Sequence, residues 1–109
     1  MVSTFAGSGT EGSGNGIGTE AQFNLPFGVA VDSSDNVYVA DLDNHRIRKI
    51  TPAGVVSTLA GTGTEGFADG TATTAQFNYP SGVAVDSSGN VYVGDSVNQL
   101  IRKTEYKVP

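Results

Sequence analysis

Short runs of valine and other apolar residues, each bounded by polar turn residues, recur along the chain. The run Gly28–Asp32 (GVAVD) is followed closely by Asn36–Asp41 (NVYVAD). Apolar runs of this length predict strands that are buried on both faces. The intervening Ser33–Asp35 has the composition of a tight hairpin turn, because Ser, Asp and Asn side chains bond turn amides. The two runs therefore predict neighbouring antiparallel strands.

A third and a fourth strand are predicted after this hairpin. Apolar and charged residues alternate in Arg46–Thr51 (RIRKIT), which predicts a strand with one solvated face. Pro52–Gly54 predicts a turn into Val55–Ala60 (VVSTLA), the fourth run. The pattern as a whole indicates a unit of four short antiparallel strands.

The same unit occurs twice. Shifting the chain by 54 positions aligns Val2–Lys49 with Val56–Lys103, and 32 of these 48 positions are identical. The 109 residues therefore form one tandem repeat, with units at about 2–55 and 56–109. In the second unit we expect strands at Gly82–Asp86, Asn90–Asp95 and Leu100–Tyr106. Four-stranded units at a period of roughly 40 to 55 residues predict an all-β fold, a β-propeller with two four-stranded blades per chain.

A glycine-rich segment precedes each hairpin. GSGTEG at residues 7–12 and GTGTEG at residues 61–66 have the glycine spacing of a dinucleotide-binding loop. That fingerprint is meaningful only between a strand and a helix, because the phosphate binds the free amides of the helix. The glycines that follow, and then Pro26, leave room for no more than one helical turn. We therefore interpret the segment as a connector between blades, with Phe23 and Phe77 packed into the crevice, and we expect no cofactor.

Composition and charge argue against several classes of function. Cysteine is absent, which excludes disulfides, thiolate metal sites and a cysteine nucleophile. The net charge is −5, with a pI near 4.5, whereas nucleic-acid-binding proteins usually carry a basic surface. No basic leader with an apolar core and no apolar run near ~18 residues is present. We expect no nucleic-acid or membrane partner, and no signal peptide in this chain; the cellular compartment stays open.

Candidate catalytic and metal-binding residues are few. His45 is the single histidine, and we interpret it as a loop-packing residue rather than a ligand or a base. Asp41, Asp43 and Asp95 are weak candidates for calcium, which takes several oxygen ligands. The second unit has no counterpart of Asp43, and acidic side chains at strand ends commonly bond turn amides. We therefore predict no metal and no enzymatic activity; the alternative is a metal-assisted hydrolase or lyase-like site in the central channel.

Five of the six cationic residues lie on the predicted third strands: Arg46, Arg48, Lys49, Arg102 and Lys103. A nucleic-acid surface would need a basic patch, and the chain also carries eleven acidic residues. The alternating pattern instead favours a solvated strand face with ion pairs between blades.

The run P-x-G-V-A-V-D-x-x-x-N-V-Y-V-A/G-D-x-x-N-x-x-I-R-K, present in both units, resembles the NHL repeat, a β-propeller blade motif. The preceding TLAGTGTEGFADGTATTAQF resembles the longer-loop version of that blade. The family's histidine follows the asparagine at Asn44–His45, whereas Gln99 replaces it in the second unit. The resemblance implies a six-bladed propeller and scaffold or binding roles. Some related propellers are lyases or lactone hydrolases, but their metal-binding residues cannot be placed on this chain.

Loops at one end of the predicted propeller are expected to form a shared recognition surface. The connector and the loop between the second and third strands lie on the same face, and recognition commonly uses loops held by a rigid scaffold. The sequence does not specify a ligand for this surface; a protein, a peptide or a sugar is a candidate. The candidate residues are Glu11, Asn15, Asn44, His45, Arg46, Glu65, Asp69, Asn98 and Gln99.

Self-association is predicted because two blades leave two apolar faces uncovered. Val2–Ala6 matches the fourth strand Val56–Ala60, while Leu100–Tyr106 has no fourth strand after it. We expect Val2–Ala6 to complete the second blade of a neighbour, so that three copies close into a six-bladed homotrimer; two or four copies would give four or eight blades. The chain would then be a natural, fragmentary or designed building block. The assembly residues are Val2, Thr4, Phe5, Leu100, Ile101 and Tyr106.

Overall fold

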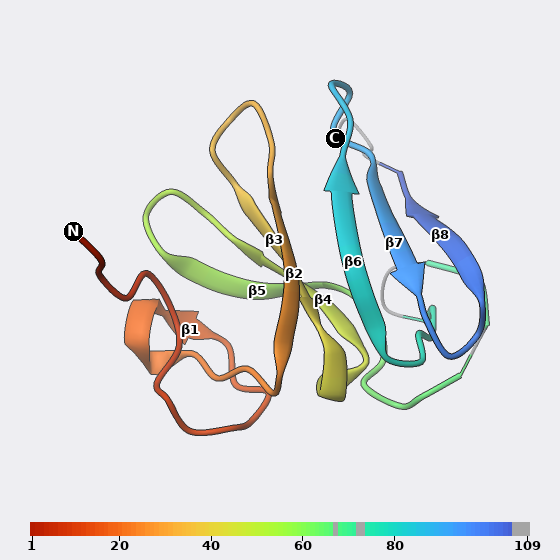
Figure 1. The fold of residues 1–109 in the computed structure, drawn as a ribbon, viewed down its shortest axis with the longest axis horizontal. Helices are drawn as coiled ribbons and strands as arrows, with labels where there is room; N and C mark the ends of the chain where they lie inside the picture. Colours follow the sequence, from red (N-terminus) through yellow and green to blue (C-terminus); the bar gives the residue numbers. More distant parts are fainter. Residues whose placement is uncertain (67, 72–73, 106–109) are drawn as a thin grey trace.

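The computed structural model describes residues 1–66, 68–71 and 74–105, which form an all-β fold of two antiparallel sheets (Figure 1). The first sheet, called blade 1, has the strand order β1-β5-β4-β3-β2. Strands β2 to β5 are the four strands predicted for the first unit. The bounds are β1 Gly16–Ile17, β2 Pro26–Val31, β3 Val37–Asp41, β4 Arg46–Ile50 and β5 Val55–Ala60.

The second sheet, called blade 2, has three strands in the order β6-β7-β8. Their bounds are Pro80–Val85, Val91–Asp95 and Leu100–Thr104. The registers of the two blades correspond under the 54-residue shift: Val39 lies opposite Arg48 in blade 1, and Val93 lies opposite Arg102 in blade 2. The sequence repeat is therefore also a structural repeat.

The connector before each blade consists mainly of bends and irregular backbone in its described residues. Its helical structure in the first unit is one 3-10 turn, η1, at Gly18–Glu20, and a second 3-10 turn, η2, spans Leu42–Asn44 after β3. Gly7 and Gly9, together with Gly61 and Gly63, have positive φ, a backbone region that residues with a Cβ rarely enter. The interpretation as a connector therefore agrees with the backbone, although the strand β1 within it was not predicted.

The predicted hairpin turns are closed by aspartate. Asp32 Oδ1 accepts hydrogen bonds from the amides of Ser34 and Asn36, each at 2.9 Å, and Oδ2 accepts one from the Tyr38 hydroxyl at 2.9 Å. Asp86 has the same arrangement in blade 2. Short acidic side chains bond turn amides in this way, which joins β2 to β3 and β6 to β7 at a defined register.

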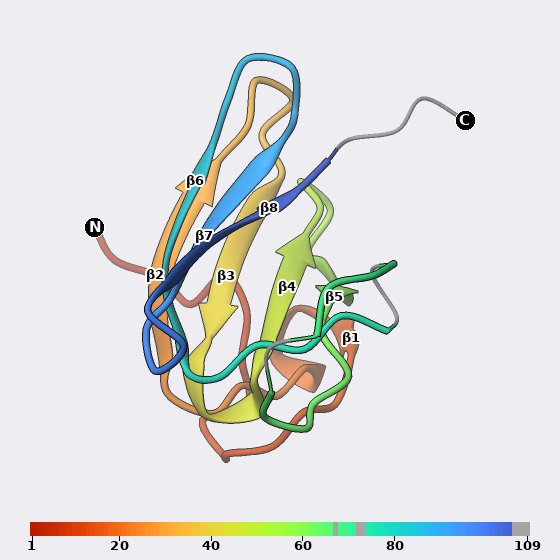
Figure 2. The same ribbon diagram turned by 90° about the vertical axis from the view of Figure 1, so that its right-hand side faces the viewer.

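The main core lies between the two blades. Blade 1 contributes Tyr38, Ala40 and Ile47, together with Ala60 at the end of β5. From the other side come the buried residues Phe77, Val91 and Val93 and the partly buried Val83 and Val85. Figures 1 and 2 show β2 and β6 running side by side in both views, so the inner strands of the two blades are neighbours.

The opposite face of blade 1 carries a second cluster of buried residues, Ala21, Val39, Ile50 and Val56. Beside it, however, Val29 and Val31 of β2 are 66% and 58% exposed. The prediction that the first run is buried on both faces is therefore wrong for β2 within one chain. The reason is tertiary: residues 4–6 and Phe23 lie against part of this face, but no second blade packs on it among the described residues, so we call it the uncovered face.

The predicted strand at Val2–Ala6 is also absent from this structure. Val2 is 98% exposed, and residues 1–6 are not paired with any strand. A strand requires a partner edge, and the outer edge of blade 1 is already occupied by β5 and β1. β8 lies at the edge of the three-stranded sheet with no fourth strand among the described residues. Tyr106 lies outside the described residues.

Candidate functional site

A buried ion pair links β3 and β4 to the connector of blade 1. Arg48 Nη1 donates to Asp41 Oδ2 at 2.8 Å, and both side chains are fully buried. The guanidinium also donates to the carbonyl oxygens of Gln22 (2.8 Å) and Gly14 (3.0 Å) and to Asn15 Oδ1 (2.8 Å). The alternating pattern predicted a solvated strand face with ion pairs between blades. This prediction is wrong for Arg48, which is buried and paired within its own blade. Arg48 anchors the connector to its own blade.

Asp41 is fully engaged by donors in this network. Its Oδ1 accepts the amide of Asn24 at 2.8 Å, and its Oδ2 accepts Asn44 Nδ2 at 2.7 Å in addition to Arg48. Asn44 Nδ2 donates further to the carbonyl of Gly12 at 2.7 Å. A guanidinium and two amide donors occupy the positions that a cation would need. The geometry of Asp41 is that of a structural carboxylate.

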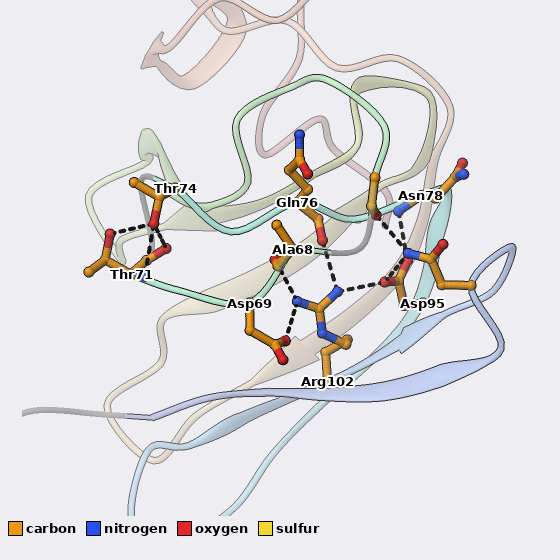
Figure 3. Close-up of polar contacts among 10 residues, drawn as sticks. Ala68, Asp69, Thr71, Thr74, Gln76, Asn78, Asp95 and Arg102 are labelled. Atoms are coloured by element: carbon orange, nitrogen blue, oxygen red, sulfur yellow. Dashed lines mark hydrogen bonds and ion pairs between the residues drawn. The ribbon is translucent and has the colours of Figure 1, made fainter.

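Blade 2 repeats this arrangement (Figure 3). Arg102 donates to Asp95 and to Asp69, each at 2.8 Å, and to the carbonyl oxygens of Ala68 and Gln76. Asp95 Oδ1 accepts the amide of Asn78 at 2.7 Å, and Asn98 Nδ2 donates to Asp95 Oδ2 and to the carbonyl of Gly66. The sequence contained a signal for both networks, because this arginine and this aspartate recur at equivalent positions in the two units.

Each buried arginine also stacks over the aromatic residue of its connector. The guanidinium carbon of Arg48 lies 5.0 Å from the Phe23 ring centroid, and that of Arg102 lies 5.2 Å from the Phe77 ring centroid. A cation over a ring face is attractive and holds the connector against the blade. Phe77 lies in the core between the blades, as expected, whereas Phe23 is only partly buried on the uncovered face of blade 1.

His45 bridges the two blades. Its Nδ1 accepts the backbone amide of Tyr79 at 3.1 Å, and the two rings meet edge to face at 4.6 Å between centroids. Both residues have positive φ, near 55°. Gln99 is the counterpart of His45 in the second unit, and Leu25 is the counterpart of Tyr79 in the first unit. Both also have positive φ. The structure therefore places His45 in a packing contact across the blade interface.

The other candidate recognition residues lie around the loops at one end of the blades. Glu11, Asn15, Glu65, Asp69 and Gln99 are exposed, while Asn44, Arg46 and Asn98 are partly buried. Arg46 Nη2 donates to the carbonyl of Thr62 in the connector of blade 2, at 3.2 Å. Asp43 is partly buried, and its amide donates to the Asn24 carbonyl. Hydrogen bonds thus hold the connectors and the loops after β3 and β7 together.

Within the described ranges, no group of three or more His, Cys, Asp and Glu side chains is arranged to hold a metal ion. No helix there has the length and apolar character needed to span a membrane.

Two hollows lie on the uncovered parts of the blades. A cavity of about 900 Å³ runs along the outer edge of β8, and it is lined by Leu100 to Glu105 and by connector residues that include Ala75 and Phe77. A smaller groove of about 290 Å³ lies on the uncovered face of blade 1. Its lining is almost entirely apolar: Thr4, Phe5, Ala6, Phe23, Pro26, Val29, Val37, Val39 and Ile50.

Two repeated antiparallel blades, each anchored by the same arginine and aspartate, define a β-propeller-like repeat fold. A family model described as NHL repeat matches residues 23–50 and 77–103, one match in each blade. The chain belongs to the NHL repeat family.

Curated relatives agree with this assignment. The chain is 40% identical over 92 residues to Protein SUPPRESSOR OF QUENCHING 1, chloroplastic, of Arabidopsis thaliana; the match covers 84% of this chain and 9% of that protein. It is 37% identical over 92 residues to NHL repeat-containing protein 2 of Homo sapiens, with 81% of this chain and 13% of that protein covered. The chain thus spans only a small part of the relatives it matches.

Solved structures share the fold. A Bacteroides thetaiotaomicron protein of unknown function superposes with a TM-score of 0.83 at 32% identity, covering 90% of this chain and 25% of that one. An auxiliary nutrient binding protein from the same organism gives a TM-score of 0.80 at 32% identity, covering 91% and 27%. In both cases this chain corresponds to about a quarter of the solved chain.

Proposed function

We propose that the chain is a non-catalytic propeller building block that assembles with further copies of itself into a closed ring, and that the ring serves as a scaffold or binding module. The observation that supports this proposal is a correspondence between surfaces. The two uncovered blade faces carry residues that are equivalent, and with one exception among those compared identical, to residues of the two halves of the contact already formed between blade 1 and blade 2.

The first half of this contact is the face of blade 2 that packs against blade 1. Phe77, Val83, Val85, Val91 and Val93 pack against blade 1. Their counterparts under the 54-residue shift lie on the uncovered face of blade 1, where Val29 and Val31 are exposed: Phe23, Val29, Val31, Val37 and Val39. All five pairs are identical residues. The uncovered face of blade 1 therefore has the chemistry of a surface that receives a blade.

The second half belongs to the side of blade 1 that faces blade 2. Tyr38, Ala40 and Ile47 are buried in that contact. Their counterparts on blade 2 are Tyr92, Gly94 and Ile101, and Ile101 is 78% exposed. Blade 2 of one copy can therefore pack on blade 1 of the next as blade 1 and blade 2 pack within the chain. This contact is head-to-tail, and it closes when the ring is complete.

Three copies would give the six blades that the family resemblance favours, since propellers contain roughly four to eight blades. Native mass spectrometry tests the proposal, and we expect a dominant species at three times the chain mass of 11.2 kDa. A dominant species of two or four copies would still support a closed ring, but one of four or eight blades. A folded chain that remains monomeric at high concentration would contradict the proposal.

An interface variant with a matched control sharpens this test. Ile101→Glu places a charge on the proposed interface at a position that is exposed in the single chain, so the fold should survive and the assembly should dissociate. Val97→Glu is the control, because Val97 is also exposed and its counterpart in the first unit is the acidic Asp43. Equal dissociation of both variants would argue against a specific interface.

The binding role has separate support. Two of the solved relatives are named as auxiliary nutrient binding proteins, and the exposed loop residues Glu11, Glu65 and Gln99 lie at one end of the blades. We expect peptides or sugars to bind at these loops, as detected by chemical-shift changes confined to them. The non-catalytic part is tested by a screen for lactone hydrolysis with and without divalent metals. Turnover that is lost in His45→Ala would overturn it.

A further inference from the structure

We infer that the outer edge of β8 binds residues 2–6 of a second copy as an antiparallel fourth strand, in one defined register. This inference rests on the proposed assembly but is more specific, since blade faces can pack without any exchange of strands. It names the segment that fills the cavity beside β8 and the residue pairs that meet there.

The template is the pairing of β4 with β5 in blade 1. Ile50 lies opposite Val56, Lys49 opposite Ser57 and Arg48 opposite Thr58. A register shift between Ile47 and Arg48 places Ile47 opposite Ala60. Adding 54 to the β4 residue numbers gives the equivalent residues of β8, and subtracting 54 from the β5 residue numbers gives the equivalent residues at the start of the chain. The four pairs then become the contacts expected between two copies. They are Ile101 with Ala6, Arg102 with Thr4, Lys103 with Ser3, and Thr104 with Val2.

The segment has the right side chains for this position. Residues 2–6 read VSTFA and residues 56–60 read VSTLA, so only Phe5 and Leu59 differ. Val56 is 2% exposed in blade 1, whereas Val2 is 98% exposed in the single chain. Transfer of an apolar side chain out of water lowers the free energy of the system. Nearly the same sequence is therefore a paired strand in one unit and an unpaired segment in the other.

The cavity beside β8 is shaped to receive Val2. In blade 1, Val56 packs with Ala21, Val39 and Ile50. The counterparts in blade 2 are Ala75, Val93 and Thr104, and both Ala75 and Thr104 line the cavity of about 900 Å³. The strand would also satisfy the free backbone groups along the outer edge of β8, as sheet edges require.

The donor must be another copy, because residues 2–6 cannot reach β8 within their own chain. The segment continues into Gly7, whose amide donates to the Gly18 carbonyl at 3.1 Å in blade 1. Figure 1 shows the N-terminus and β8 at opposite ends of the long axis, along which the molecule extends 37 Å. Five extended residues span at most about 18 Å.

Cysteine pairs test the register directly, because the chain has no native cysteine. Ser3→Cys with Lys103→Cys should link one copy to the next and give covalent species of two and three chains on a non-reducing gel. Lys49→Cys with Ser57→Cys is the matched control, since this pair lies across β4 and β5 within one chain. This pair should form a link within one chain, so no band of higher mass should appear on the gel. The same variant is used to choose the oxidant or the short thiol-reactive linker for the experiment.

A shifted pair tests the alternative register. Thr4→Cys with Lys103→Cys should not link, because a shift of one residue places the two side chains on opposite faces of the sheet. Linkage of this pair in place of Ser3–Lys103 would overturn the register. If the unmodified protein is a trimer but neither pair links, the inference fails and the proposed ring stands. If the protein is only monomeric, both fail.

Discussion

Gly28 of β2 lies so close to Ser81 of β6 that a Cβ on the glycine would be 2.5 Å from the Ser81 carbonyl oxygen. The same Cβ would be 3.2 Å from the Cα of Gly82. The inner strands of the two blades therefore approach backbone to backbone at this point. Only a residue without a side chain allows that approach, which explains why glycine stands here.

Gly28→Ala should destabilise the chain by about 1–3 kcal/mol, because the added methyl group must push the inner strands apart. Chemical denaturation followed by circular dichroism measures this loss. Unchanged stability would show that the inner strands separate without cost.

Gly82→Ala makes the opposite test at the equivalent position of blade 2. Nothing lies within 4 Å of a Cβ at Gly82 in the single chain, so the fold should be retained. In the proposed ring, however, that methyl group would face the Phe27 carbonyl of the next copy. We expect a lower trimer fraction in native mass spectrometry with little change in the circular dichroism spectrum. An unaffected trimer would argue that the interface between copies differs from the interface within the chain.

Arg48→Met should cost about 3–5 kcal/mol of unfolding free energy, because it leaves the buried Asp41 carboxylate without its cation. Arg102→Met should cost less, since Arg102 is 9% exposed and its second partner, Asp69, is in solvent. Lys49→Met is the control on the same strand, and a partly exposed lysine should change stability by no more than about 0.5 kcal/mol. Urea denaturation of the three variants gives the ranking, and equal losses would contradict it.

His45→Ala should weaken the contact between the blades, because the Tyr79 amide loses its acceptor and the ring contact is removed. A hydrogen bond of this kind contributes about 0.5–1.5 kcal/mol. Hydrogen exchange at the Tyr79 amide should become faster. His45→Gln should recover part of the protection, since Gln99 occupies the equivalent position in the second unit. Exchange that is equally fast in both variants would show that the side-chain acceptor is unimportant.

Acid should destabilise the hairpin turns. Partial burial raises the pKa of Asp32, but hydrogen bonds from Asn36, Tyr38 and Ser34 outweigh this effect and hold the pKa below its ordinary value of 3.8. The side-chain and backbone hydrogen bonds from Asn90 likewise lower the pKa of Asp86. A lowered folded-state pKa stabilises the protein above the unfolded-state value, and the contribution is lost as the pH falls below about 3.8 and through the folded-state pKa.

Urea denaturation between neutral pH and pH 2 measures this dependence. The double variant Asp32→Asn, Asp86→Asn should be less stable at neutral pH, because an amide offers these donors fewer acceptor sites. Its unfolding free energy should also decrease less on acidification than that of the parent chain. An identical decrease would assign the acid sensitivity to other carboxylates.

Much of the fold follows from local chemistry that is visible in the sequence. The two valine-rich runs, the Ser-Asp turns between them and the 54-residue repeat predict the hairpins β2–β3 and β6–β7, because strand propensity and turn bonding act over a few residues. The same reasoning identified the glycine-rich segments as connectors. The blade motif, present in both units, likewise indicates the NHL repeat family from the sequence alone.

The contacts at the candidate site depend on tertiary structure. Alternation in RIRKIT predicted a solvated charged face, yet Arg48 is buried because the connector folds over β4 and supplies carbonyl acceptors from residues far away in the sequence. His45 meets Tyr79 only because two blades stack. Sequence periodicity specifies which residues share a face, but it cannot say what covers that face. Burial of Val29, and of Val2 in the proposed ring, is therefore decided by the neighbouring blade.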